Sequence, residues 1–330
     1  MTSKAIQVRK PTLPAVRPSI ALALGGGGAR GLAHILMLEV FDELGLKPSI
    51  IAGTSIGAIF GAAYASGLSA KLIRAHAEEV LGSKRFGLAR LLISARSEPI
   101  LKVLNILPVR ASLLAPEPLL DLVLPSKLAR DFAHLQIPLK IVATDFYAQE
   151  QVIIDSGPLR SAVAASMALP AIFTPVLRSR AQLLMDGGLV NPLPFDVLNG
   201  AADIIIAVDV SGAATGPGKR IQPTAFEALI ASSQILQRSI VREKLKAQQP
   251  DIYIDVNVDA FNVLDFHKFR DILAAAETAK AQLRRQLQRV LSSQTAETLP
   301  AAEATEAPTK PTLKRRLPGL KQLTTRGRRT

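Results

Sequence analysis

Three short stretches of the chain hold residue types that could do chemistry together. They are the glycine run Gly26, Gly27 and Gly28, the stretch Gly-Thr-Ser-Ile-Gly centred on Ser55, and Asp186-Gly187-Gly188. A serine between two such glycines is typical of a strand-to-helix turn that exposes a nucleophilic hydroxyl. A carboxylate can act as its general base, and glycine amides at a helix start can hold a negative charge. The three stretches therefore predict acyl transfer from an ester.

The glycine run also fits a different function, which is dinucleotide binding. Gly26-x-Gly28-x-x-Gly31 satisfies the fingerprint of that site. Such a site needs an Asp or Glu about 20 residues further on, at the end of the second strand. Here the predicted strand at 50–52 ends in Gly53, and the acid is missing. The phosphate loop of nucleotide triphosphatases fails at 213–220, which has alanine at the first glycine position and Arg220 at the Ser/Thr position. The sequence therefore favours an oxyanion hole over a phosphate site.

The serine needs a base, and there are two arrangements to consider. Asp186 follows an apolar strand, so its carboxylate should lie at the same sheet edge as Ser55. A carboxylate with an ordinary pKa near 4 is a poor base at neutral pH, so this dyad predicts a site that excludes water. The order Ser55, Asp186, His267 also permits a Ser–Asp–His triad. Because His267 lies at a polar helix start that Asp265 would cap, we expect the dyad and keep the triad as the alternative.

Arg30 is the fixed charge of the glycine run. It could bond to carbonyl groups and hold the loop, or it could meet an anionic group of a substrate. We favour the structural role.

The elements that must position these residues alternate between strand and helix. Strands at Ile20–Leu24 and 50–52 are each followed by a helix, at 29–44 and 56–66. Such alternation predicts a largely parallel sheet. The same rhythm returns later, with strands at 139–146, 151–155, 182–185 and 204–210, a short helix at 159–168, and amphipathic helices at 224–248 and 269–291. Residues 69–135 are helical and leucine-rich, and form either a cap over the site or a cover for one sheet face.

Composition excludes several classes of function. The chain has 330 residues, no cysteine and 48% hydrophobic residues, so it can bury a large core without disulfides. Its four histidines are scattered without ligand spacing, so we expect neither a metal site nor a cofactor. No apolar run approaches the roughly 18 residues of a membrane span, and the amino terminus does not resemble a signal peptide. We therefore expect a cytoplasmic protein.

The net charge of +13 lies mostly at the two ends. Residues 1–18 hold four basic residues and no acidic one, and residues 301–330 hold eight basic and two acidic residues, so the ends supply ten of the 13 charges. The nearly neutral body and its 4% aromatic content argue against nucleic-acid binding. We expect basic, disordered tails at 1–17 and 293–330. The alternative is that they hold the protein peripherally on anionic lipid.

Taken together, the motifs resemble the patatin-like phospholipase family. The resemblance is carried by Gly-Gly-Gly-Ala-Arg-Gly from Gly26, by Gly-Thr-Ser-Ile-Gly around Ser55 and by Asp186-Gly187-Gly188. Further similar stretches are IVATDF at 141–146, ASMALPAIFTPV at 165–176 and DGGLVNPLP at 186–194. The resemblance covers roughly residues 18–290.

The resemblance implies an α/β protein with a three-layer αβα fold and a mostly parallel sheet, in one domain over 18–292. It implies a Ser–Asp dyad that hydrolyses acyl esters of phospholipid or lysophospholipid without a metal. By position, Ser55 would be the nucleophile, Asp186 the base, and Gly26, Gly27 and Gly28 the oxyanion hole. Asp145 and Ser166 lie in family-like stretches and are expected to be structural. A soluble esterase or thioesterase acting on a smaller acyl group, and a lipid-binding protein without activity, are the alternatives.

Overall fold

The computed structural model describes residues 17–84, 87, 115–125, 127–179, 182–212, 222 and 225–297. Its strands are β1 (Ile20–Leu24), β2 (Ile50–Thr54), β3 (Leu139–Asp145), β4 (Gln151–Ile154), β5 (Val176–Ser179), β6 (Gln182–Asp186), β7 (Ile204–Asp209) and β8 (Ile252–Asp255). They form one sheet in the order β5-β6-β3-β2-β1-β7-β8, and β4 pairs with β3. The five strands from β3 to β8 in that order are parallel, whereas β4, β5 and β6 join antiparallel. The predicted mostly parallel sheet is confirmed.

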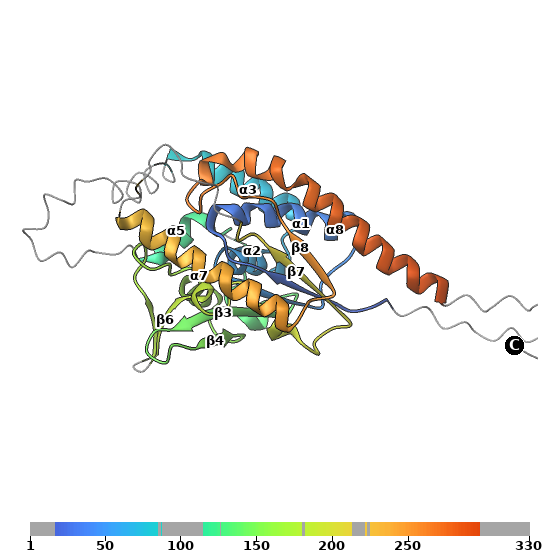
Figure 1. Ribbon diagram of the computed structural model, residues 1–330, viewed down its shortest axis with the longest axis horizontal. Coiled ribbons are helices and arrows are strands. Elements are labelled where there is room, and N and C mark those ends of the chain that lie inside the picture. Colours follow the sequence, from blue (N-terminus) through green and yellow to red (C-terminus); the bar gives the residue numbers. More distant parts are fainter. Residues whose placement is uncertain are drawn as a thin grey trace, which may run out of the picture.

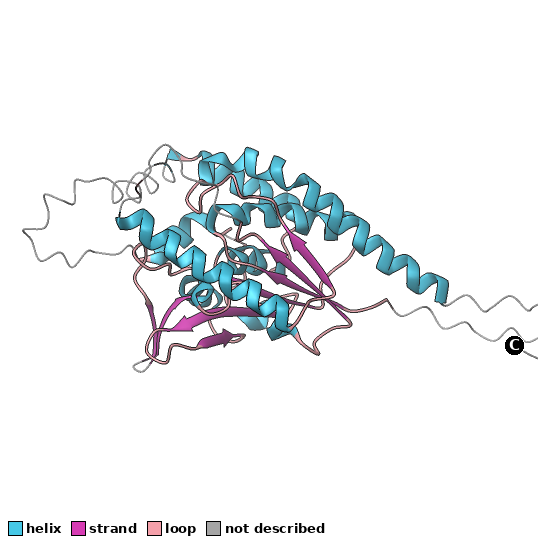
Figure 2. Ribbon diagram, in the orientation of Figure 1, coloured by secondary structure: helices cyan, strands magenta, loops and turns pink. Residues whose placement is uncertain are grey.

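Helices cover both faces of this sheet. They are α1 (His34–Glu43), α2 (Ile56–Ala65), α3 (Ala70–Gly82), α5 (Pro116–Val123), α6 (Leu159–Ser166), α7 (Ala225–Ala247) and α8 (Phe269–Glu297). Short 3-10 helices are η1 (Gly28–Ala33), η4 (Phe132–His134), η5 (Gly187–Leu189), η6 (Asp196–Leu198) and η7 (Phe266–Lys268). Figure 1 shows α8 lying along α1 on one side of the molecule, with α7 on the other side of the strands. Figure 2 shows the strands as a layer between helices, so the predicted three-layer αβα fold is confirmed.

The two faces of the sheet differ in side-chain size. Successive residues of a strand point to opposite faces. Leu22 and Leu24 of β1 belong to the larger core, which also contains residues of α1, α2 and α8. Ala21 and Ala23 belong to the smaller core, together with Val241 of α7 and residues 193–198. Because alanine is short, α7 and this segment can pack close to the strands.

Strand β3 brings together two parts of the chain that are distant in sequence. Since β4 pairs with residues 141–144 of β3, strands β2 and β6 share the other edge of β3. On that edge β2 ends with Thr54 beside Val142, and β6 arrives from the opposite direction and ends with Asp186 beside Ala143. The carboxyl ends of β2 and β6 therefore face each other at this edge, because β2 is parallel and β6 antiparallel to β3. This arrangement places Ser55 next to Asp186.

Three sequence expectations differ from the structure. The expected helix at 29–44 begins as the 3-10 helix η1 and becomes α-helical at His34. The short strands β5 and β8 were not predicted. Helix α8 extends to Glu297, beyond the expected domain boundary at 292. The middle of the proposed cap at 69–135, between 85 and 114, lies outside the described residues except for residue 87. Both basic tails also lie outside them, apart from residue 17 and residues 293–297.

Candidate active site

Ser55 lies in a tight turn between β2 and α2. Its φ of 55° and ψ of −120° are a conformation that residues with side chains rarely adopt. The flanking glycines make the turn possible, since a Cβ on Gly57 would lie 2.1 Å from the carbonyl oxygen of Leu24. A Cβ on Gly53 would lie 2.6 Å from the carbonyl oxygen of Gly57. The Gly-Thr-Ser-Ile-Gly stretch therefore forms the strand-to-helix turn that its glycine spacing predicts.

A buried serine supports this turn from α6. The amide of Ser55 donates to Oγ of Ser166 over 2.9 Å, and that hydroxyl donates to the carbonyl oxygen of Val142 over 2.6 Å. Ser166 is fully buried. Asp145, the other residue read as structural, accepts hydrogen bonds from the amides of Tyr147 and Ala148 in the turn after β3. Ser166 thus fixes the backbone of Ser55, whereas Asp145 closes a turn.

Asp186 is hydrogen-bonded to the serine. Oγ of Ser55 donates to Oδ2 of Asp186 over 2.7 Å, and the amide of Gly188 donates to Oδ1 over 2.7 Å. Asp186 is only 3% exposed. Burial raises the pKa of Asp186 to about 6, against the opposing effect of these two hydrogen bonds. The carboxylate is thus a stronger base than an exposed one and is still mostly ionised at neutral pH.

The three glycines expected to form the oxyanion hole occupy different environments. The amide of Gly26 donates to the carbonyl oxygen of Pro192 over 2.8 Å, so it is engaged within the fold. Among the described residues, the amides of Gly27 and Gly28 have no hydrogen-bond acceptor. Both residues line a cavity together with Ser55. Of the three glycines predicted to form an oxyanion hole, Gly27 and Gly28 are therefore the ones whose amides are free to donate among the described residues.

Arg30 and His34 donate hydrogen bonds to backbone carbonyl groups in and around the glycine run. Nε of Arg30 donates to the carbonyl oxygen of Phe261 over 2.7 Å, and its Nη1 donates to that of Ser211. Bonds to carbonyl groups are what the structural role that we favour requires. Nε2 of His34 donates to the carbonyl oxygen of Gly25 over 2.8 Å. Burial lowers the pKa of His34 to about 4, so the ring is neutral. Sequence reasoning assigned no role to His34, because its partner is visible only in the folded loop.

The cavity beside Ser55 measures about 180 Å³. Its wall contains Ser55 and Asp186, but most of it is aliphatic or aromatic. These apolar residues include Ile59, Phe60 and Ala63 of α2, Ile73 and Val80 of α3, and Phe173 after α6. Among the described residues that line it, Asp186 is the only carboxylate, and there is no lysine or arginine. Such a wall suits an acyl chain.

Among the described residues, no hydrogen bond joins His267 to Asp186, which a triad would require. His267 is exposed on η7, and the oxygens of Asp186 accept from Ser55 and Gly188 instead. Asp265 does not cap the helix start as expected, since its carboxylate accepts from the amide of Asn262 and from Nζ of Lys268. Within the described ranges there is no group of three or more potential metal ligands and no helix long and apolar enough to cross a membrane.

Comparison with known proteins identifies the family. A family model described as patatin-like phospholipase matches residues 22–199. The chain belongs to the patatin-like phospholipase family. An uncharacterized NTE family protein of Mycobacterium tuberculosis is 35% identical over 207 residues, which are 62% of this chain and 53% of that protein. Patatin-like phospholipase domain-containing protein 6 of Mus musculus is 31% identical over 277 residues, or 77% of this chain.

The chain spans only part of these relatives, about half of the mycobacterial protein and 20% of the mouse protein. Among solved structures, VipD from Legionella pneumophila is similar with a TM-score of 0.43 and 16% identity, over 83% of this chain and 68% of that one. The patatin-like match ends at Asn199, before β7, β8, α7 and α8. The part of the chain after Asn199 nevertheless contributes to the site, because Ile230, Val263 and Phe266 also line the cavity.

Proposed function

We propose that this protein is a serine hydrolase that releases fatty acid from phospholipid or lysophospholipid through an acyl-enzyme on Ser55. One observation carries the proposal. The hydroxyl of Ser55 donates over 2.7 Å to a buried carboxylate in the wall of an apolar cavity. Membership of a phospholipase family supports a lipid ester as the substrate.

In the acylation step, Ser55 Oγ attacks the ester carbonyl carbon while Asp186 accepts the hydroxyl proton. The amides of Gly27 and Gly28 donate to the oxyanion of the tetrahedral intermediate, a contact that typically contributes about 3 kcal/mol per donor. When the intermediate collapses, the ester C–O bond breaks and Asp186 gives its proton to the leaving alcohol. The acyl group then remains on Ser55.

In the deacylation step, Asp186 takes a proton from water as the water oxygen attacks the acyl carbonyl. Collapse of this second intermediate breaks the bond to Ser55 Oγ, and Asp186 returns the proton to that oxygen. The pKa of Asp186, raised to about 6 by burial, suits both tasks at neutral pH.

The apolar wall favours a long acyl chain over the smaller acyl group of a soluble esterase or thioesterase. Ala63 of α2 is 2% exposed and lines the cavity, so a larger side chain there would occupy part of it. In Ala63→Phe, kcat/KM for long-chain esters should fall by at least about 10-fold while short-chain esters are spared. Equal losses for both chain lengths would favour the smaller substrate.

The direct test is labelling with a fluorophosphonate, beside release of fatty acid from mixed phospholipid vesicles. Wild type should label and release fatty acid, Ser55→Ala should do neither, and Asp186→Asn should lose release. His267→Ala is the matched control for the triad and should keep full activity, whereas a loss beyond about 10³-fold would favour the triad. A wild-type protein that neither labels nor releases fatty acid, even with anionic vesicles, would leave the lipid-binding alternative.

The basic ends form a separate part of the proposal, in which they hold the protein peripherally on anionic lipid. Each basic residue near such a surface can contribute up to about 1 kcal/mol. A chain truncated after Leu299 should co-sediment less with anionic vesicles than the full chain. Unchanged co-sedimentation would remove this part and leave the hydrolase proposal intact.

A further inference from the structure

Residues 191–193, just after the Asp186 turn, contact all three parts of the proposed active site through their backbone. The amide of Asn191 donates to the carbonyl oxygen of Gly187 over 2.9 Å. The carbonyl oxygen of Asn191 accepts from Oγ1 of Thr54, the residue before the nucleophile, over 2.9 Å. The carbonyl oxygen of Pro192 accepts from the amide of Gly26 over 2.8 Å. This segment therefore connects the base, the nucleophile and the glycine run.

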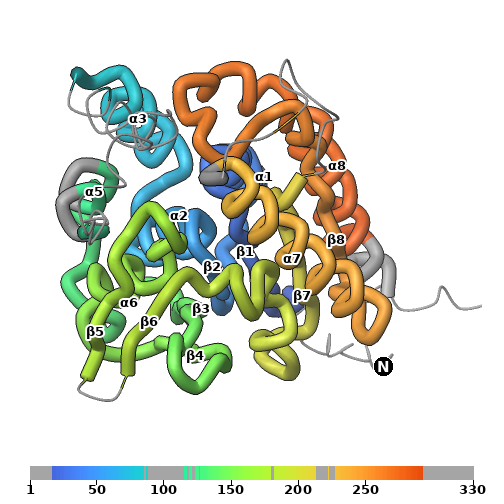
Figure 3. The backbone as a smooth tube through the Cα atoms, turned by 60° about the vertical axis from the view of Figure 1, so that its left-hand side comes forward, coloured from blue at the N-terminus to red at the C-terminus, as the bar shows by residue number. Residues whose placement is uncertain are grey.

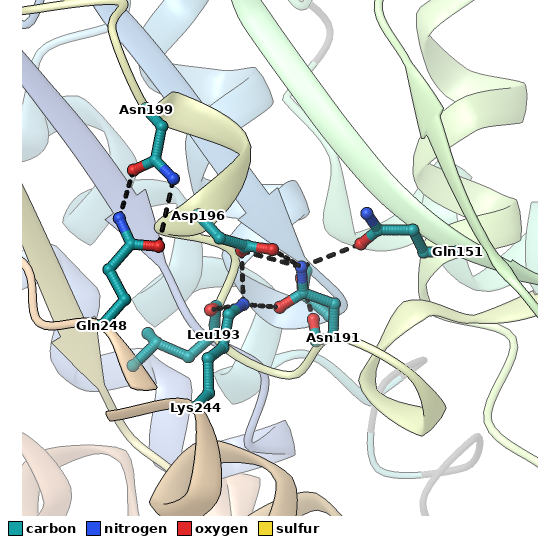
Figure 4. Close-up of polar contacts among 8 residues, drawn as sticks. Gln151, Asn191, Leu193, Asp196, Asn199, Lys244 and Gln248 are labelled. Atoms are coloured by element: carbon teal, nitrogen blue, oxygen red, sulfur yellow. Dashed lines mark hydrogen bonds and ion pairs between the residues drawn. The ribbon is translucent and has the colours of Figure 1, made fainter. Parts of the chain in front are cut away.

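The segment is held in turn by one side chain from α7. Nζ of Lys244 donates to Oδ1 of Asn191 over 2.5 Å, to the carbonyl oxygen of Leu193 over 2.9 Å, and to the carboxylate of Asp196 (Figure 4). An ammonium group has three donors, and all three are used here. Figure 3 shows α7 between β6 and β8 in this view, and the contact joins α7 to the loop that follows η5.

The side-chain amide of Asn191 makes the remaining hydrogen bonds of this network. Its Nδ2 donates to Oε1 of Gln151 over 2.9 Å and to Oδ1 of Asp196 over 3.0 Å. Both ends of the Asn191 side chain are therefore fixed, one by the lysine and the other by β4 and η6. The backbone of Asn191 cannot shift without breaking several of these bonds.

Lys244 is largely buried, with 16% of its side chain exposed, and lies 4.8 Å above the ring of Phe195. Burial lowers its pKa, against the opposing effect of Asp196. A buried ion pair adds little to stability compared with a well-packed apolar side chain. What an apolar side chain cannot supply is three directed hydrogen bonds to one short segment, so the contacts point to a role in geometry.

We infer that Lys244 is a positioning residue for the reaction at Ser55, acting through residues 191–193 on the glycine run, the nucleophile turn and the base turn. This inference rests on the proposed hydrolase function. Lys244 does not line the cavity, so it acts without contacting the acyl chain. Misplacement of reacting groups by about 1 Å can cost on the order of 100-fold in rate.

The test compares Lys244→Met with Lys246→Met in the full chain. Lys246 is the matched control, because it lies on the same helix, is exposed and, within the described part of the chain, bonds only to Glu243. Well below the unfolding temperature, Lys244→Met should lower kcat and the fluorophosphonate inactivation rate by about 10- to 100-fold with KM within about threefold. Hydrogen exchange at the Gly26 amide should be at least about 10-fold faster. Lys246→Met should match wild type in all three measurements.

Wild-type kcat and wild-type exchange at Gly26 in folded Lys244→Met, even with a lower Tm, would overturn the inference. If Lys244→Met does not fold, Asp196→Asn decides, since it keeps the shape and removes the charge. A smaller loss of kcat at constant KM supports the inference, and wild-type kinetics overturn it. A wild-type protein that does not label at Ser55 would instead reject the proposed function, and exchange at Gly26 would still decide whether Lys244 holds the segment.

Discussion

At the scale of single residues, the environment of Asp186 predicts the pH dependence of activity. The dyad requires the ionised carboxylate, and burial raises its pKa to about 6. The value of kcat/KM for an uncharged ester should therefore rise about tenfold per pH unit below 6 and level off above about 7. A pH profile between 4.5 and 8 checks this, with circular dichroism at each pH as the control for folding. A rise centred near pH 4 would mean that the carboxylate is solvated.

The same raised pKa predicts a stability cost, which Asp186→Asn should remove. In the unfolded chain this group titrates near its ordinary 3.8, so between about pH 4 and 6 the folded state binds the extra proton and stability falls as pH rises. A shift of about two units corresponds to about 3 kcal/mol. At pH 8, Asp186→Asn should thus be up to about 3 kcal/mol more stable than wild type, and at pH 4 the gain should vanish. Urea unfolding at both values checks this, and an equal gain at both would contradict it.

At the scale of elements, the turn around Ser55 depends on close contacts that only glycine permits. A Cβ on Gly57 would lie 2.1 Å from the carbonyl oxygen of Leu24, whereas nothing lies within 4 Å of one on Gly82 in α3. Overpacking typically costs about 1–3 kcal/mol, and here the clash is with backbone. Gly57→Ala should therefore lose at least about 2 kcal/mol and most fluorophosphonate labelling. Gly82→Ala is the control and should change stability by less than about 1 kcal/mol. Equal stability of the two variants would show that the turn can relax.

The turn around Ser55 and its supports show which parts of the site could be predicted from sequence. The turn, the strands around it and Asp186 were predictable, because local glycine spacing and apolar runs encode them. The supports of the site were not, since Ser166 and Asn191 bond to partners 111 and 137 residues away. Strands β5 and β8 have four residues each, too few for a clear period. The antiparallel direction of β6 depends on its pairing with β3, and no local sequence pattern predicts that pairing.

At the scale of the whole molecule, the patatin-like match ends at Asn199, but two further strands of the same sheet, β7 and β8, follow it. Strand β7 pairs with β1 along its whole length, in the middle of the sheet. The carbonyl oxygen of Val263 accepts from the amide of Ala29, and that of Phe261 accepts from Arg30, so the later elements also hold the glycine run. The folding unit therefore includes β7, β8, α7 and α8.

This unit predicts the behaviour of two truncated chains. A chain ending at Asn199 leaves the edge of β1 unpaired and removes α7 and α8, which cover the two faces of the sheet. It should show no cooperative thermal unfolding and no labelling at Ser55. A chain ending at Leu299 keeps every described element and should unfold within about 2 °C of the full chain and label at the same rate. Circular dichroism melts beside fluorophosphonate labelling distinguish the two. Cooperative unfolding of the shorter chain would mean that the first six strands and their helices form a core that the later elements merely extend.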